Sequence, residues 1–201
     1  MMKKIIITLF IVSTLSCKAQ SNIKSLDGDG SCPPYDTNCY EKDVNNEFDK
    51  FIGNWKYVDA NNEITFMLKK EAHYQLDSNS NYEDLLTGEY QYIENGVELA
   101  NTLIDFNNSN ITGYSHKLFG GIYIRKYSYF DTCTGDSNTS DVKVHIYINH
   151  PTNSGPHGNV IMRYFNDNGV EKIEACIYDE TVSGDGTRTI IPDGQYTFIK
   201  Q

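Results

Sequence analysis

The cysteines carry the most distinctive chemistry in this chain, and Cys17 has the clearest context. It follows a basic start with two lysines, an apolar run over residues 5–12 and a short exit of mostly small residues. This order is typical of a secretory signal, and the apolar run is too short to span a membrane. A cysteine directly after such a signal is the residue that bacterial lipoproteins acylate. We therefore predict a signal peptide over residues 1–16, lipid attachment at Cys17, and an exported protein anchored to a membrane of the cell envelope.

A second cleavage position keeps an alternative open. Thr14 stands where lipoprotein signals usually carry Leu or Val, and Cys17 is followed by Lys-Ala-Gln. Cleavage after Ala19 or Gln20 would release a soluble secreted protein without a lipid.

The other four cysteines form an even set, which suits two disulfides in an oxidising compartment. They are Cys32, Cys39, Cys133 and Cys176. Three connectivities are possible, and we predict Cys32–Cys39 with Cys133–Cys176, because the first pair closes a short local loop. A zinc site is the alternative, but the chain has no C-x2-C pair and no His at ligand spacing.

Other candidate chemistry is weak. His145, His150 and His157 would matter only if they converged, and loop histidines are more often solvated. The Asp-Gly loops at 27–30 and 184–186 do not continue into a calcium-binding pattern. Nucleophile and phosphate-loop signatures are absent from the sequence. We therefore predict no catalytic residue, no metal, no cofactor and no enzymatic activity.

Charge and aromatic content limit the partners. The net charge of −10 argues against nucleic acid and against electrostatic docking on anionic lipid. The chain has 15 tyrosines, and alternation places Tyr90 and Tyr92 on one strand face and Tyr123, Tyr127 and Tyr129 on another. Such faces could stack a sugar ring or contact a protein, although ordinary cross-strand packing explains them equally well.

The elements that must position these residues are mostly strands. Residues 17–39 are polar and predict a tether, and the spacing of Tyr40, Val44, Phe48 and Phe51 predicts a short helix. Period-two alternation follows, with turn signals between the runs. The clearest predicted strands cover 54–57, 64–69, 88–92, 123–129, 142–149, 160–165, 173–177 and 196–200. We expect one all-β domain over residues 40–201, an antiparallel up-and-down meander of about 8–10 strands closed into a barrel.

The segment Phe51-Ile52-Gly53-Asn54-Trp55 resembles the opening of the lipocalin and fatty-acid-binding barrels, where a Gly-x-Trp begins the first strand. The resemblance implies structural roles: Gly53 lets the chain pass close to the barrel end, and Trp55 packs across that end. The sequence departs from the lipocalin pattern, because no second lipocalin motif and no Arg in the last strand can be placed. The chain also resembles uncharacterised secreted domains of Bacteroidota that begin Phe-x-Gly-x-Trp after a lipoprotein-type leader, which implies no activity.

Two hypotheses for function follow. The first is a non-enzymatic binder of a small apolar or amphipathic ligand, because a barrel of this size can enclose one. The alternative is a structural or interaction protein of the envelope whose barrel is filled by bulky inward side chains such as Phe66, Ile146 and Phe198. A secreted hydrolase is a third reading that rests on the compartment alone. The sequence identifies no protein partner.

Overall fold

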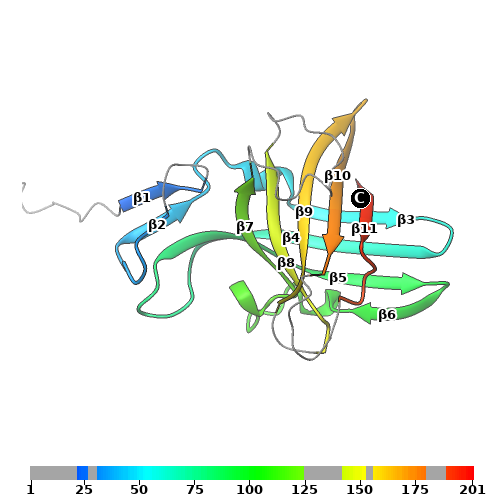
Figure 1. Cartoon of the computed structure of the whole chain (residues 1–201), viewed down its shortest axis with the longest axis horizontal. Helices are drawn as coiled ribbons and strands as arrows, with labels where there is room; N and C mark the ends of the chain where they lie inside the picture. The colour runs from blue at the N-terminus through cyan, green and yellow to red at the C-terminus, as the bar shows by residue number, and fades with distance from the viewer. Residues whose placement is uncertain (1–21, 27–30, 125–141, 153–155, 180–188) are drawn as a thin grey trace, which may run out of the picture.

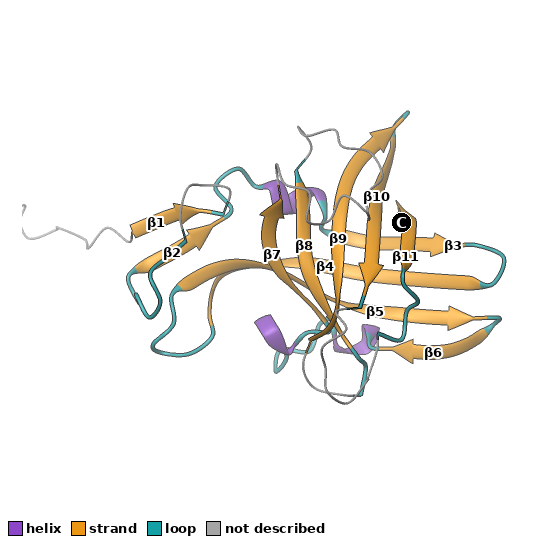
Figure 2. Cartoon of the chain, viewed as in Figure 1, coloured by secondary structure: helices purple, strands orange, loops and turns teal. Residues whose placement is uncertain are grey.

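The computed structural model describes residues 22–26, 31–124, 142–152, 156–179 and 189–201 (Figure 1). This part of the chain forms eleven strands and three short 3-10 helices, with no longer helix (Figure 2). The strands are β1 (Asn22–Ser25), β2 (Cys39–Lys42), β3 (Gly53–Val58), β4 (Asn62–Gln75), β5 (Tyr82–Glu94), β6 (Val97–Asn101), β7 (Leu118–Ile124), β8 (Lys143–Asn149), β9 (Pro156–Asp167), β10 (Val170–Tyr178) and β11 (Gly194–Lys200). The 3-10 helices are η1 (Glu47–Lys50), η2 (Leu103–Asp105) and η3 (Gly113–Ser115).

Eight of the strands form a closed antiparallel barrel. Their order is β5-β4-β3-β11-β10-β9-β8-β7, and β7 pairs with β5 to complete the ring. The seam between the first and last barrel strands pairs Lys56 with Ile199 and Trp55 with Lys200. This architecture confirms the prediction of an all-β meander, and the barrel fits a lipocalin-like fold.

The sequence pattern explains why these strands form. Ile64, Phe66 and Leu68 alternate along β4 and are each at most 1% exposed, because every second side chain points into the barrel. Two hairpins turn at Asn-Gly pairs, and Asn95 and Asn168 both adopt the positive φ angles that such tight turns need. The predicted turns at these positions are therefore confirmed.

β5 carries additional strands outside the barrel. Its C-terminal half pairs with β6, while its first residues pair in parallel with β2, which pairs in parallel with β1. Strands therefore occupy residues 22–25 and 39–42, within and next to the segment predicted to be a polar tether.

The predicted N-terminal helix over 40–51 is wrong. Tyr40 belongs to β2 and is paired with Tyr82 of β5, and only the single 3-10 turn η1 follows. Asn46 has a left-handed backbone, which interrupts any continuous helix. Val44 is consequently 46% exposed, whereas Phe48 and Phe51 are buried as their spacing suggested.

The tyrosine face predicted around residues 90 and 92 is also different in the structure. Tyr90 and Tyr92 do not form an exposed patch, because both point into the barrel and are at most 1% exposed. His145 and Asn149 do lie opposite the inward face of β8, but they are buried as well. Tyr127 and Tyr129 lie outside the described residues.

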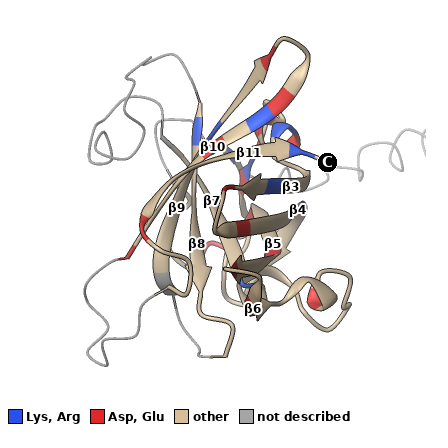
Figure 3. Ribbon diagram, turned by 90° about the vertical axis from the view of Figure 1, so that its right-hand side faces the viewer, with Lys and Arg blue, Asp and Glu red and all other residues tan. Residues whose placement is uncertain are grey.

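Charged side chains on β9, β10 and β11 are interleaved by sign (Figure 3). The ion pairs there are Arg163–Glu174, Lys172–Asp167 and Lys200–Glu171. Each of these basic residues thus has an acidic partner on a neighbouring position of the wall.

Candidate functional site

The barrel interior is the first place to look for a site, and in the described residues it is filled by side chains. The rings of Phe66 and Phe198 stack with centroids 4.6 Å apart, and the Tyr90 hydroxyl donates to the carbonyl of Asn149 at 2.9 Å. The core side chains that are at most 1% exposed include Trp55, Ile64, Phe66, Leu68, Leu86, Tyr90, Tyr92, Leu118, Val144, Ile146, Ile148, Val160, Met162, Ile173, Ala175, Ile177 and Phe198. Side chains that line a ligand-sized cavity would be exposed to a water molecule inside it. These core side chains are almost completely inaccessible, so they do not line such a cavity.

The base of the barrel is closed around Trp55. Its indole nitrogen donates to the Phe51 carbonyl at 2.7 Å, and the Tyr164 ring meets it edge-on. Lys200 of the last strand places its ammonium 5.3 Å from the Trp55 ring centroid. Gly53 has a φ of +132°, and a Cβ there would lie 3.2 Å from the Lys200 side chain. Gly53 and Trp55 both lie at this end of β3, and Lys200 contacts the indole from β11, a strand that lacks Arg.

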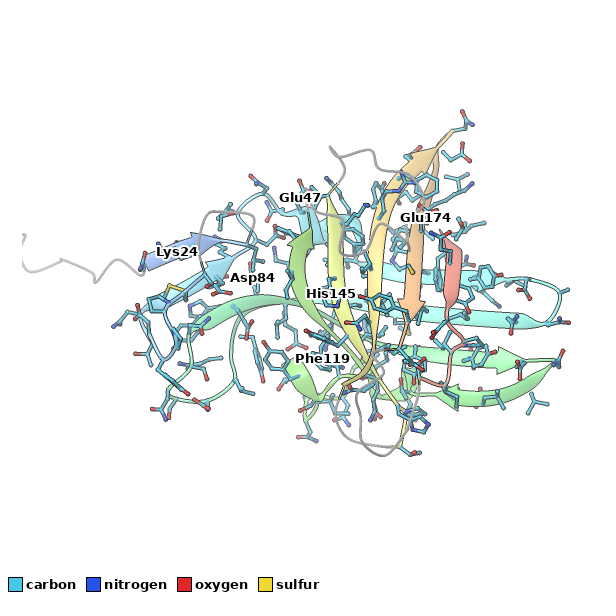
Figure 4. The ribbon with its side chains drawn as sticks, in the orientation of Figure 1. Lys24, Glu47, Asp84, Phe119, His145 and Glu174 are labelled. Carbon is cyan, nitrogen blue, oxygen red and sulfur yellow. A yellow bond between two sulfur atoms is a disulfide. The ribbon has the colours of Figure 1, made fainter. Side chains whose placement is uncertain are left out.

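A buried polar network next to this base binds the N-terminal segment to the barrel (Figure 4, Asp84). Both carboxylates are nearly inaccessible: Asp43 is 0% and Asp84 is 2% exposed. Asp43 accepts hydrogen bonds from the Lys70 ammonium, the Tyr123 hydroxyl and the amides of η1. Asp84 accepts from the Tyr40 hydroxyl and from the main-chain amide of Asp43. Every carboxylate oxygen of the two residues accepts a hydrogen bond, so the burial of these polar groups is compensated.

Hydrogen bonding decides the protonation of Asp43. Burial alone would raise the pKa of its carboxyl, but donors from Tyr123, Lys70 and the amides of Phe48 and Glu47 outweigh burial and lower that pKa below its usual value. Asp43 is therefore ionised at neutral pH and pairs with Lys70, whose ammonium lies 2.9 Å away.

A second polar group lies on the outer wall of the barrel, and we call Glu71, Thr87, Glu89 and His116 the His116 cluster. His116 Nδ1 lies 2.8 Å from Glu89 Oε1, and its Nε2 lies 3.0 Å from Glu71 Oε1 without hydrogen-bond alignment. Thr87 donates to Glu71 at 3.0 Å. His116, Thr87 and Glu89 are all at most 1% exposed.

The connection between β6 and β7 explains this burial. Thr87 and Glu89 alternate with inward residues of β5 and so point outward, where the connection carries His116 onto them. The amide of Gly113 in η3 donates to Glu71 at 2.8 Å. Burial alone would raise the pKa of Glu71, but hydrogen bonds from Gly113 and Thr87 and the nearby Lys69 charge lower it.

The His116 cluster is enclosed within the wall of the barrel. A carboxylate–histidine pair can serve as a base, but His116 is wedged between two carboxylates and is closed to solvent. The described residues contain no group of three His, Cys, Asp or Glu side chains placed to hold a metal. The contacts of the His116 cluster hold the β6–β7 connection against the barrel wall. The sequence around these residues contains no motif from which these contacts could be predicted.

Aromatic side chains continue along the outer wall from this cluster (Figure 4, Phe119 and His145). We call Tyr74, Tyr114, Phe119, Tyr147 and His145 the aromatic row. Successive ring centroids are 5.7, 5.3, 5.6 and 4.9 Å apart. The three tyrosines are half-buried, so the row presents ring surface to solvent along β4, η3, β7 and β8.

Burial and nearby carboxylates raise the pKa of two of these tyrosines. The Tyr114 hydroxyl donates to Glu83 at 2.6 Å, and burial together with that carboxylate raises the pKa of Tyr114 well above its usual value. Burial and Glu71 raise the pKa of Tyr74 in the same direction. The aromatic row is therefore a surface of rings with polar tips, and its tyrosines are not among those that alternation placed together on a strand face.

The predicted cysteine and histidine residues are placed as follows. Cys32 and Cys39 form a disulfide, which confirms that pair. Cys176 is also disulfide-bonded, but its predicted partner Cys133 lies outside the described residues, as does Cys17. His145 is hydrogen-bonded to Asn159 at 2.7 Å, His150 accepts from Thr152, and the His157 side chain is outside the described part.

The disulfide bears on the compartment. A Cys32–Cys39 bond is typical of proteins in the periplasm or outside the cell, where thiols are oxidised. In the part of the chain that the structure describes, no helix is both long and apolar enough to cross a membrane.

Comparisons with known proteins give one match. A family model described as a family of unknown function, DUF6705, matches residues 2–201. No curated protein and no solved structure matches the chain.

Proposed function

The chain belongs to the DUF6705 family of unknown function, and we propose that it is a lipid-anchored, non-enzymatic barrel of the cell envelope that contacts partners through its outer surface. The observation that carries this proposal is the packed interior, where core side chains such as Phe66, Ile146 and Phe198 are at most 1% exposed. A barrel with a filled interior can still hold side chains on its outer surface in place for contact with a partner, and the aromatic row is such a set.

Lipid attachment at Cys17 is the anchoring part of the proposal. The signal over residues 1–16 and the disulfide between Cys32 and Cys39 both support export. The contact part rests on the aromatic row, because half-buried tyrosines offer apolar area and polar tips, the composition favoured at protein interfaces. We propose a protein of the envelope as the partner.

Native mass spectrometry of the chain purified without its signal, under oxidising conditions and without detergent, tests the filled barrel. We expect the bare protein mass and no saturable binding of the apolar probe N-phenyl-1-naphthylamine. A bound mass of a few hundred daltons that is lost on denaturation would instead support the rival hypothesis, a barrel that binds an apolar ligand.

A cavity variant provides the positive control. Phe198→Ala removes a ring that stacks on Phe66 in the core and should leave an apolar void. Voids of this kind bind benzene. The variant should therefore bind benzene while the unaltered chain does not, which shows that the assay detects interior binding when space exists. Binding of benzene by both proteins would contradict the filled barrel.

A further inference from the structure

The chain leaves little length between the proposed lipid and the folded protein. β1 begins at Asn22, so only residues 18–21 separate it from Cys17. At 3.3–3.6 Å per residue, the steps from Cys17 to Asn22 reach at most about 18 Å. An acyl chain on Cys17 would therefore hold the β1 end of the molecule beside the bilayer.

That end is held firmly to the barrel. β1 pairs with β2 over four residue pairs, and β2 pairs with β5. The Cys32–Cys39 disulfide ties the last part of the β1–β2 connection to the start of β2, and the Tyr40 hydroxyl donates to Asp84. The orientation of the barrel relative to this end is thus fixed by the sheet rather than by a free linker.

Exposed apolar side chains gather at this end. Tyr35 is 82% exposed at the tip of the disulfide loop, in a turn closed by the Asp36 amide and the Pro33 carbonyl. Ile23 on β1 is 50% exposed, and Leu76 in the β4–β5 turn is 58% exposed.

The β4–β5 turn belongs to the same end. His73 stacks on Tyr82 with ring centroids 4.0 Å apart, and Tyr40 of β2 meets His73 edge-on at 4.7 Å. Figure 1 shows β1, β2 and this turn together at one end of the molecule.

We propose that this end, with Tyr35, Ile23 and Leu76, rests on the phospholipid bilayer to which Cys17 is attached. Tyrosine suits the headgroup layer, because its ring is apolar and its hydroxyl stays hydrated. The net charge of −10 disfavours an anionic surface, so the occupant is a zwitterionic bilayer. This inference rests on the lipid attachment proposed above.

The test uses the full lipidated chain in phosphatidylcholine vesicles that carry brominated acyl chains. Tyr35→Trp places a reporter in the proposed contact, and Val170→Trp places a matched reporter on the β9–β10 hairpin, where Val170 is 43% exposed. Both retain Trp55, whose buried indole gives the same background. Flotation of the vesicles reports anchoring independently of fluorescence.

We expect both variants to float with the vesicles, and Tyr35→Trp to show a blue shift and at least twofold stronger quenching than Val170→Trp. Cys17→Ser combined with Tyr35→Trp should neither float nor be quenched. Flotation with equal quenching of the two reporters would overturn the bilayer contact and leave the anchor intact. Failure of the Cys17 chain to float would overturn both proposals.

Discussion

The Asp43 network allows the sharpest test of how this fold is held together. Asp43→Asn keeps the shape of the side chain but replaces one acceptor oxygen with a donor. If the new NH2 group takes the Oδ2 position, it faces the Lys70 ammonium and one η1 amide. If it takes the Oδ1 position, it faces the Tyr123 hydroxyl and the other η1 amide. Two hydrogen bonds and a buried ion pair are lost, so we expect the free energy of unfolding at pH 7 to fall by about 3–5 kcal/mol.

The matched control is Asp49→Asn. Asp49 lies 4.0 Å from the same Lys70 ammonium, but its side chain is 60% exposed. Solvent screening makes such a contact weak, so this variant should stay within about 0.5 kcal/mol of the unaltered chain. Urea unfolding followed by the fluorescence of Trp55, the single tryptophan, measures both variants.

The pH dependence gives the deciding result. The pKa of Asp43 is lowered in the folded state, so its contribution is complete above the unfolded pKa of about 3.9 and is lost as pH falls through the lower folded pKa. The cost of Asp43→Asn should therefore shrink as the pH is taken from 7 toward 2. The reasoning is refuted if Asp43→Asn costs no more than Asp49→Asn, or if its cost is the same across this pH range.

Three further predictions concern other parts of the fold. Cys32→Ser opens an eight-residue loop and should lower the free energy of unfolding by about 2.5 kcal/mol. Amide hydrogen exchange should become faster mainly in β1 and β2. An equal increase in exchange along the whole chain would contradict this prediction. Gly88→Ala would place a Cβ 2.1 Å from a main-chain oxygen of β4 and should cost about 2–3 kcal/mol in urea unfolding, whereas Gly194→Ala meets only a side-chain ring and should cost less. Burial, followed by nearby ionisable side chains, raises the pKa of Tyr92 and Tyr196 to about 12, so Tyr92→Phe should remove an absorbance step near pH 12 rather than pH 10 in an alkaline titration. The neutral phenols stabilise the folded state below pH 10, and this contribution is lost as the pH rises toward 12.

Local patterns in the sequence were sufficient for much of the barrel. Alternation along β4 and β8 identified inward residues such as Phe66 and Ile146, because period two directly reflects the pleat of a strand. The Asn-Gly turns were equally readable, because few other residues tolerate that backbone. The helix prediction over 40–51 failed because a spacing of three and four can also arise from residues that reach the core from separate elements.

The polar clusters could not be predicted in the same way. Glu71, Glu89 and His116 come from three places in the chain, and each alone reads as an outward polar residue. Their burial arises only when the β6–β7 connection covers the wall, which is a tertiary event without a local signal. The contact between Lys200 and Trp55 could have been predicted from the sequence. The lipocalin resemblance implied an Arg in the last strand near Trp55, and Lys200 is a basic residue at that place.

The pairing of β3 with β11 has a consequence for how the chain acquires its structure. The seam joins Trp55 to Lys200, which are separated by 145 positions. If the chain is exported as proposed above, with its N-terminus first through a translocation channel, this seam cannot form until residue 200 has emerged. Contacts this distant in sequence also form slowly. The barrel is therefore expected to close late, and under the proposed export the chain would stay unfolded enough to pass through the channel until that closure.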